Sequence, residues 1–124
     1  MDKPYANRTW QQGDVVSLPV MKQLSPRTKI TSFSLAAVES WADDSGVLKE
    51  RRNVFVIETL GRDAEYVYRE ARLGRMVTVD GYLRSDVVKG QNVIRIRTFH
   101  IHIWDYDHAN RTPGYSDPDG APAA

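Results

Sequence analysis

The spacing of apolar and polar residues predicts a strand, a helix and a second strand in the middle of the chain, over residues 53–84. The apolar run at 54–57 is short and β-branched, which favours a strand over a helix. From 62 to 73, apolar residues recur at three- and four-residue spacings among charges, as on an amphipathic helix. Gly74 is expected to end that helix in a left-handed conformation. Alternation resumes over 77–83, which predicts the second strand.

This unit alone fits two architectures, a parallel βαβ unit or a helix that covers one end of a small Greek-key barrel. Alternation predicts two more strands before it, at residues 15–21 and 30–40, and one after it, at 93–104. Three strands therefore precede the helix and two follow it. We accordingly predict an all-β OB-fold, a five-stranded Greek-key barrel with one helix between strands 3 and 4.

The last predicted strand contains a change of phase. Its apolar positions are even-numbered up to Ile96, and from Phe99 onward they are odd-numbered. One extra residue near 97–98 would reconcile the two halves, which predicts a β-bulge of the kind that bends long barrel strands. A hairpin around residues 89–92 is expected to join this strand to its predecessor.

The ends of the chain differ from this body. Residues 1–14 are mostly polar and are predicted to form an N-terminal arm, whose one large apolar group, Trp10, should dock on the body, or alternatively on a partner. Residues 15–105 make up the predicted OB-fold domain. Residues 106–124 are rich in Pro, Gly and Asp and lack apolar periodicity, so we predict a flexible tail.

Composition narrows the possible functions. The 124 residues carry a net charge of +1 and no cysteine, so disulfides and thiolate metal sites are excluded. No apolar run approaches the length of a membrane span, and the first residues do not read as a secretory signal. We expect a cytoplasmic, nucleoid-associated or organellar protein.

Motifs for catalysis are missing from the chain. No Ser-His-Asp arrangement, Gly-rich phosphate loop or paired-acid signature is present, so we expect no enzyme activity and no cofactor. His100 and His102 share a strand face and, with His108, could suggest a zinc site. No third ligand has a convincing spacing, so we predict outward-facing polar residues and no metal.

Two stretches resemble the bacterial and mitochondrial single-stranded DNA-binding protein family. That family carries F-S-L-A and then a Trp in its second strand, and V-x-V/I-x-G-x-L-R after a helix that ends at Gly. The chain has Phe33-Ser34-Leu35-Ala36, Trp41 and VTVDGYLR (residues 77–84) at these places. The resemblance covers roughly residues 15–104. It implies binding of single-stranded DNA, or RNA, in replication, recombination or repair, and assembly into a dimer or tetramer.

The chain departs from the family pattern at positions that usually stack bases. Val54 and Leu60 stand where the family has aromatic residues in its third strand, and the hairpin at 86–92 has no aromatic residue. These departures favour a divergent plasmid, phage or organellar member, or the primosomal PriB branch. The apolar positions Val54, Val56 and Leu60 could instead bury against a second copy.

A groove for a single strand requires cations for phosphates and flat side chains for stacking. Trp41 lies at a strand end beside a basic segment, although a tryptophan there could equally cover the barrel mouth. Arg95 and Arg97 share one strand face, which fits either a solvated face or phosphate contacts. The predicted nucleic-acid-binding residues are Trp41, Lys49, Arg51, Arg52, Tyr82, Arg84, Lys89, Arg95 and Arg97.

Two functional hypotheses follow. The first is a non-enzymatic protein that binds single-stranded nucleic acid by phosphate contacts and aromatic stacking, without sequence specificity. The alternative is an OB-fold adaptor, a primosome-like subunit whose main partner is a protein. The first requires Trp41 and the pair Arg95 and Arg97 to lie along a common track.

Overall fold

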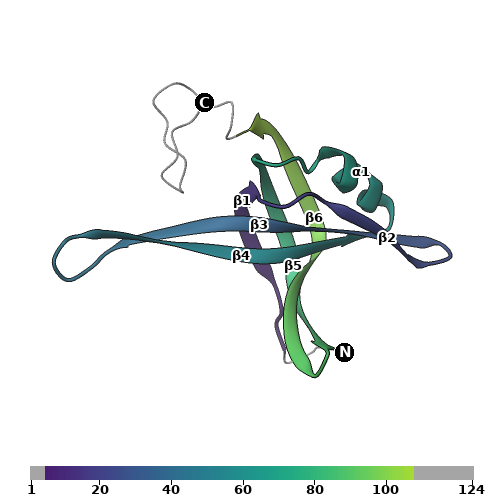
Figure 1. Ribbon diagram of the computed structural model, residues 1–124, viewed down its shortest axis with the longest axis horizontal. Helices are drawn as coiled ribbons and strands as arrows, with labels where there is room; N and C mark the ends of the chain where they lie inside the picture. The colour runs from purple at the N-terminus through teal and green to yellow at the C-terminus, as the bar shows by residue number, and fades with distance from the viewer. Residues whose placement is uncertain (1–4, 108–124) are drawn as a thin grey trace.

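The computed structural model describes residues 5–107, and within them six strands and one helix. The elements in chain order are β1 (Thr9–Val15), β2 (Val20–Ser25), β3 (Thr28–Ala42), β4 (Leu48–Leu60), α1 (Arg62–Glu70), β5 (Arg75–Val88) and β6 (Gln91–Asp107). Figure 1 shows the barrel at the crossing of two long ribbons, with α1 at one end.

Five strands close the barrel in the order β1-β5-β6-β4-β3, because β1 also pairs with β3. That closure consists of the pairs Asp14–Ala36 and Val15–Leu35. β4 and β6 run parallel, and the other pairs are antiparallel. The first predicted strand, residues 15–21, is misplaced: only Val15, at the end of β1, and Val20 and Met21, at the start of β2, lie in strands. The chain leaves the sheet at residues 16–19, where Pro19 cannot donate to a ladder. With β1 and β2 counted together, the predicted five-stranded barrel with its helix between strands 3 and 4 is confirmed.

The core fills the barrel with residues from β1, β3, β4, β5 and β6 and from one side of α1. Thr31 anchors the helix, since its Oγ1 donates a 2.6 Å hydrogen bond to the carbonyl of Ala64. The buried cluster consists of Val15, Phe33, Leu35, Ile57, Val67, Ala71, Val77, Val79, Ile96 and Ile103. Since strand residues alternate between faces, the neighbours of these residues on β3, β4 and β6 point outward.

The predicted end of the helix is wrong. α1 ends at Glu70, and the N–H of Ala71 still donates to Val67 O. Gly74 has the left-handed φ of 84°, but it lies in the turn to β5, where its N–H donates to Val15 O. The guanidinium of Arg75 bonds the carbonyl of Glu70, and so provides a partner for a carbonyl of the last helical turn.

The predicted bulge in the last strand is confirmed, one residue later than expected. Pairing of β5 with β6 passes from Asp80–His100 to Gly81–Thr98, so Phe99 is the extra residue. Phe99 does not continue the inward phase: it is half exposed and packs against Tyr82, with ring centroids 5.1 Å apart.

The N-terminal arm predicted for residues 1–14 is wrong in its second half, since Thr9–Val15 forms β1. The mostly polar side chains of this segment gave no strand pattern. Its backbone nevertheless pairs with the edge of β5, from Thr9–Gly81 to Asp14–Met76, and so provides hydrogen-bond partners for that edge. Trp10 does not dock on the body, because 65% of its surface is exposed. The predicted tail begins inside β6, and residues 108–124 lie outside the described part.

Two hairpins extend well beyond the barrel (Figure 1). The longer joins β3 to β4, and its turn is held by Asp43, whose Oδ1 accepts from the N–H groups of Ser45 and Val47. The other joins β5 to β6 at the predicted position, through Lys89 (φ 50°) and Gly90 (φ 78°). Two successive positive φ values are typical of a type I′ turn, which matches the twist of the strands.

Candidate nucleic-acid interface

An open groove of about 550 Å³ crosses the outer face of the barrel. Val56 and Glu58 from β4 lie in it because their neighbour Ile57 points into the core, and Arg95 and Arg97 flank the buried Ile96 in the same way. The full lining is Lys22, Leu24, Ile30, Ser32, Val56, Glu58, Asp86, Val93, Arg95 and Arg97. The groove thus combines apolar surface from four strands with three cations and two carboxylates.

The arginines of this groove are joined by two carboxylates in one chain of ion pairs. Arg97 Nε donates to Glu58 Oε1 at 3.0 Å, and Arg95 Nε lies 3.8 Å from the second oxygen of Glu58. Arg95 Nη1 donates to Asp86 Oδ2 at 3.3 Å, and Arg84 Nε donates to Asp86 Oδ1 at 3.3 Å. Arg84, Arg95 and Arg97, three of the predicted binding residues, are therefore brought together, with Asp86 and Glu58 between them.

Glu58 and Asp86 were missed as groove residues. Glu58 is only 6% exposed and reaches Arg97 because β4 and β6 run parallel at Glu58–Arg97. No local pattern in the sequence reports that pairing. Asp86 follows Arg84 at two residues, the spacing that puts strand residues on one face, so its place beside Arg84 could have been inferred.

Trp41, Lys49 and Arg51 lie together on the β3–β4 hairpin, apart from the groove. Trp41 is directly opposite Lys49, and alternation puts Arg51 on the same face of the ribbon. Arg52 lies on the other face, in line with Val56 and the groove. Lys49 and Glu58 are nine positions apart along β4, roughly 30 Å at about 3.3 Å per residue.

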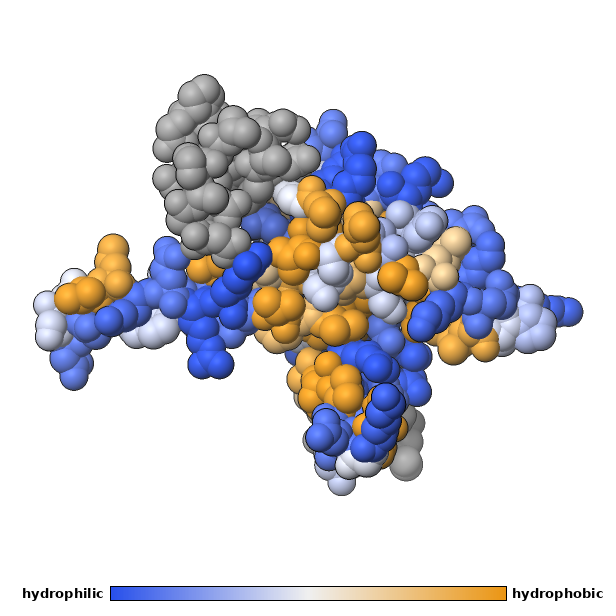
Figure 2. Space-filling model, viewed as in Figure 1, coloured by the Kyte–Doolittle hydropathy of each residue, from blue (hydrophilic) through white to orange (hydrophobic). Residues whose placement is uncertain are grey.

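The far end of this hairpin is apolar. Val47 and Leu48 are 51% and 79% exposed. Figure 2 shows apolar surface near the end of the β3–β4 hairpin and hydrophilic surface along its length. Lys89 lies in the turn of the other hairpin, at the outer end of β5.

Tyr82 lies outside the groove lining and belongs to a second cluster. It packs on Phe99, and the guanidinium of Arg8 lies 5.9 Å from the centre of the Phe99 ring. Arg8 also holds Asp80 through two hydrogen bonds of 2.9 and 2.6 Å. These hydrogen bonds, and the charge of Arg8, hold the pKa of Asp80 below its usual value.

The cluster of Tyr82, Phe99 and Arg8 belongs to a face formed by β1, β5 and β6, because its Asp80 also lines the cavity on that face. Trp10, His100 and His102 line a shallow cavity of about 310 Å³ there. Trp104 packs edge-on against His102 at 4.4 Å and donates its indole N–H to Thr78. His100 and His102 are outward-facing, as predicted. Within residues 5–107 no three potential ligands gather for a metal, and His108 lies outside that range.

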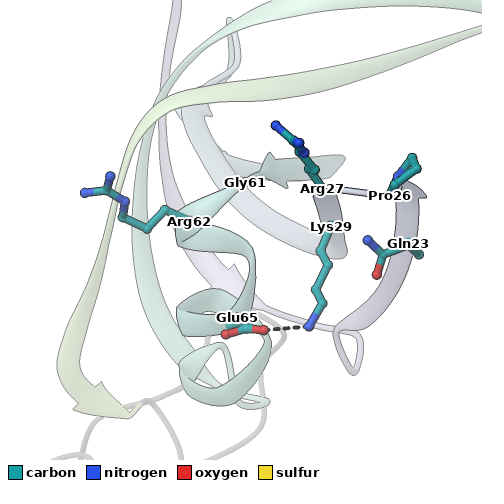
Figure 3. Close-up of a pocket in the computed structure, with 7 residues that line it drawn as sticks. All are labelled: Gln23, Pro26, Arg27, Lys29, Gly61, Arg62 and Glu65. Atoms are coloured by element: carbon teal, nitrogen blue, oxygen red, sulfur yellow. Dashed lines mark hydrogen bonds and ion pairs between the residues drawn. The ribbon is translucent and has the colours of Figure 1, made fainter.

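A third cavity, of about 360 Å³, opens between α1 and the β2–β3 hairpin (Figure 3). Lys29 reaches across it to Glu65 at 2.6 Å, and this bond lowers the pKa of the Glu65 carboxyl. Arg27 and Arg62 border the same cavity, but in Figure 3 Arg62 points away from the other side chains. These groups do not converge on one point.

Sequence comparison decides the family. The model of the single-strand binding protein family matches residues 6–107, which is most of the chain. The chain belongs to the single-strand binding protein family. No curated protein gives a match. Within the described residues, no helix is long and apolar enough to span a membrane.

Solved structures agree with this family in fold. A Plasmodium falciparum SSB in complex with ssDNA has a TM-score of 0.73 at 25% identity, and the match covers 85% of this chain and 100% of that one. A deletion mutant of the single-stranded DNA binding protein from Thermus aquaticus also has a TM-score of 0.73, at 21% identity over 81% of this chain. The chain spans about half (51%) of that protein's length. The small single-stranded DNA-binding protein from Streptomyces coelicolor has a TM-score of 0.61 at 20% identity, covering 82% and 97% of the two chains.

Proposed function

We propose that this protein binds single-stranded DNA, or RNA, by phosphate contacts and aromatic stacking, without sequence specificity and without enzymatic activity. The observation that carries the proposal is the groove in which Lys22, Arg95 and Arg97 surround apolar surface on the outer face of the barrel. Membership of the single-strand binding protein family and the likeness to a solved complex with ssDNA support it. Its role is accordingly in replication, recombination or repair.

The chemistry of the groove suits an unpaired strand. Cations bind phosphates whatever the base, and apolar surface from Leu24, Val56 and Val93 accepts the flat faces of any base. Trp41 adds one exposed ring on the β3–β4 hairpin, where Lys49 and Arg51 supply charge. A stacked base contributes about 1–3 kcal/mol, so one ring alone gives modest affinity and the phosphates dominate.

The decisive experiment is a titration with oligo-dT at 50 and 200 mM salt. Each phosphate contact contributes about −0.7 to the slope of log K against log salt for a single strand. Lys22 and Arg97 give a slope of about −1.4, and Arg84 and Arg95, which Asp86 holds in the unliganded protein, steepen it to at most about −2.8. Over this fourfold range of salt the loss of affinity is roughly 7- to 50-fold. Absence of binding at 50 mM salt would end the proposal.

Tryptophan fluorescence locates the bound strand. Trp41 lies on the hairpin, whereas Trp10 and Trp104 lie on the face of β1, β5 and β6. Addition of oligo-dT should quench the wild type and a Trp10→Phe variant, and quench a Trp41→Phe variant much less. Equal quenching in both variants would place the strand elsewhere.

We further propose that the protein self-associates into a dimer or tetramer. The face formed by β1, β5 and β6 supports this, because Trp10, Phe99 and Trp104 are each more than 40% exposed there. The alternative patch predicted at Val54, Val56 and Leu60 is less suited, since Val56 lines the groove. Native mass spectrometry tests the assembly, and a purely monomeric species would refute it.

The adaptor hypothesis has no separate observation in its favour. It proposes an exposed apolar strand that binds a protein; Val54 on β4 is exposed, but Val56 on the same face lies among the arginines of the groove. A closer relation to the primosomal branch stays a prediction. It is tested by measuring whether a variant that no longer binds oligo-dT still binds its protein partner.

A further inference from the structure

Asp86 places a negative charge within the surface that is proposed to bind a polyanion. Arg84 and Arg95 are directly opposite each other on β5 and β6. Two like charges across an antiparallel pair destabilise it. Asp86 accepts from both at 3.3 Å, through Oδ1 for Arg84 and Oδ2 for Arg95, and so relieves that repulsion in the unliganded protein.

A phosphate carries the same charge and the same geometry of acceptor oxygens as this carboxylate. On the basis of the proposed function, we infer that Asp86 is a resident competitor for phosphate, which engages Arg84 and Arg95 until a bound strand replaces it. The carboxylate of Asp86 is 29% exposed and its two hydrogen bonds are long, so it is placed to exchange. It determines how tightly the groove binds and how salt affects that binding.

Glu58 differs from Asp86 in the respects that matter for exchange. Its side chain is 8% exposed, and its bond to Arg97 is 3.0 Å. A buried carboxylate that lost its partner would be left unpaired, so Glu58 keeps Arg97 when the strand binds. Competition is therefore assigned to Asp86 alone, at the exposed edge of the groove.

Replacing Asp86 should raise the affinity for oligo-dT, whereas a structural defect in the groove would lower it. In Asp86→Asn, Arg84 and Arg95 lose the carboxylate they share and can engage phosphates, while Arg95 keeps its 3.8 Å contact with Glu58. Affinity for oligo-dT at low salt should rise about 3- to 10-fold. The slope of log K against log salt should become steeper by up to about 1.4, because each added contact contributes about 0.7. The unliganded variant should melt at a lower temperature, because the two arginines then repel each other.

The matched control is Asp63→Asn, which changes net charge equally from the exposed surface of α1, outside the groove lining. It should leave the slope unchanged. If the hairpin of Asp86→Asn does not fold, the same change is made in an Arg84→Gln background, where the cross-strand repulsion is gone. There Arg84→Gln/Asp86→Asn should bind more tightly than Arg84→Gln.

The outcomes separate this inference from the proposed function. Wild-type protein that fails to bind oligo-dT at low salt refutes the function itself. Wild-type binding combined with an unchanged or flatter slope in Asp86→Asn refutes only the competitor. Weaker binding by Asp86→Asn would show that Asp86 positions the arginines for phosphate instead of competing with it.

Discussion

Closure of the barrel depends on a single position without a side chain. Gly13 lies where β1 crosses from β5 to β3, and a Cβ there would stand 2.0 Å from the carbonyl oxygen of Ala36 and 2.7 Å from its carbon. Both atoms belong to the backbone, so no rotamer change relieves the clash. In Gly13→Ala the strands must separate by more than about 1 Å, and the pairs Asp14–Ala36 and Val15–Leu35 are lost.

The loss of stability in Gly13→Ala can be estimated from the hydrogen bonds and the buried side chains that the separation of the strands affects. Two backbone hydrogen bonds contribute about 0.5–1.5 kcal/mol each. Val15 and Leu35 are both at most 1% exposed, and losing burial equal to half of one such side chain adds about 0.8–1.5 kcal/mol. The sum is about 2–5 kcal/mol, a large fraction of the roughly 5–15 kcal/mol that stabilises a domain.

Thermal and urea unfolding measure this directly. At about 4–8 °C per kcal/mol for a domain of this size, Gly13→Ala should melt at least 8 °C below the wild type. Gly46→Ala is the control, since its φ of 79° strains any side chain but no atom lies within 4 Å of the added Cβ. It should lose only about 1–2 kcal/mol. A Gly13→Ala protein as stable as Gly46→Ala would refute the reasoning.

Three further predictions concern single contacts. Arg97→Gln should bind oligo-dT more weakly, with a slope flatter by about 0.7, in the same salt titration. Thr31→Val keeps the shape of the side chain but removes the buried hydrogen bond to Ala64, and urea unfolding should show a loss of about 1–3 kcal/mol. The ion pair of Arg8 and Asp80 stabilises the fold above pH about 4. This contribution is lost as the pH falls through the lowered pKa of Asp80. Arg8→Gln should therefore melt at a lower temperature than the wild type at pH 7, and at nearly the same temperature at pH 2.

The barrel could be predicted from the sequence because period and order are local properties. Residues 30–40 alternate, the helix repeats its apolar positions, and the change of phase before Phe99 marks the bulge. β1 could not be predicted, since Thr9–Gly13 has one large apolar residue, Trp10, and no alternation, and forms a strand through backbone pairing with the edge of β5.

The site could be predicted only as far as alternation reaches. Arg95 and Arg97 share a face because they are two residues apart, and the structure confirms that they lie together. Their carboxylate partner Glu58 comes from a strand 39 residues before Arg97, through the parallel pairing of β4 with β6. That register depends on how the barrel closes, which no local pattern in the sequence reports.

Because Trp41 lies far from the groove, oligonucleotides of different lengths test whether one bound strand contacts both. Arg52 and Val56 share the face of β4 that leads from the groove onto the β3–β4 hairpin, whereas Trp41 lies on the other face of that ribbon, about 30 Å from Glu58 along the strand. Two-stranded ribbons twist strongly, so a strand of DNA that runs straight on from the groove crosses the edge of the ribbon and reaches the opposite face, which carries Trp41, near the end of the hairpin. Short oligo-dT should therefore bind with the salt dependence of the groove and without quenching. Quenching should begin only at lengths that span the hairpin, and full quenching by the shortest oligonucleotide that binds would place Trp41 beside the arginines and contradict a two-part track.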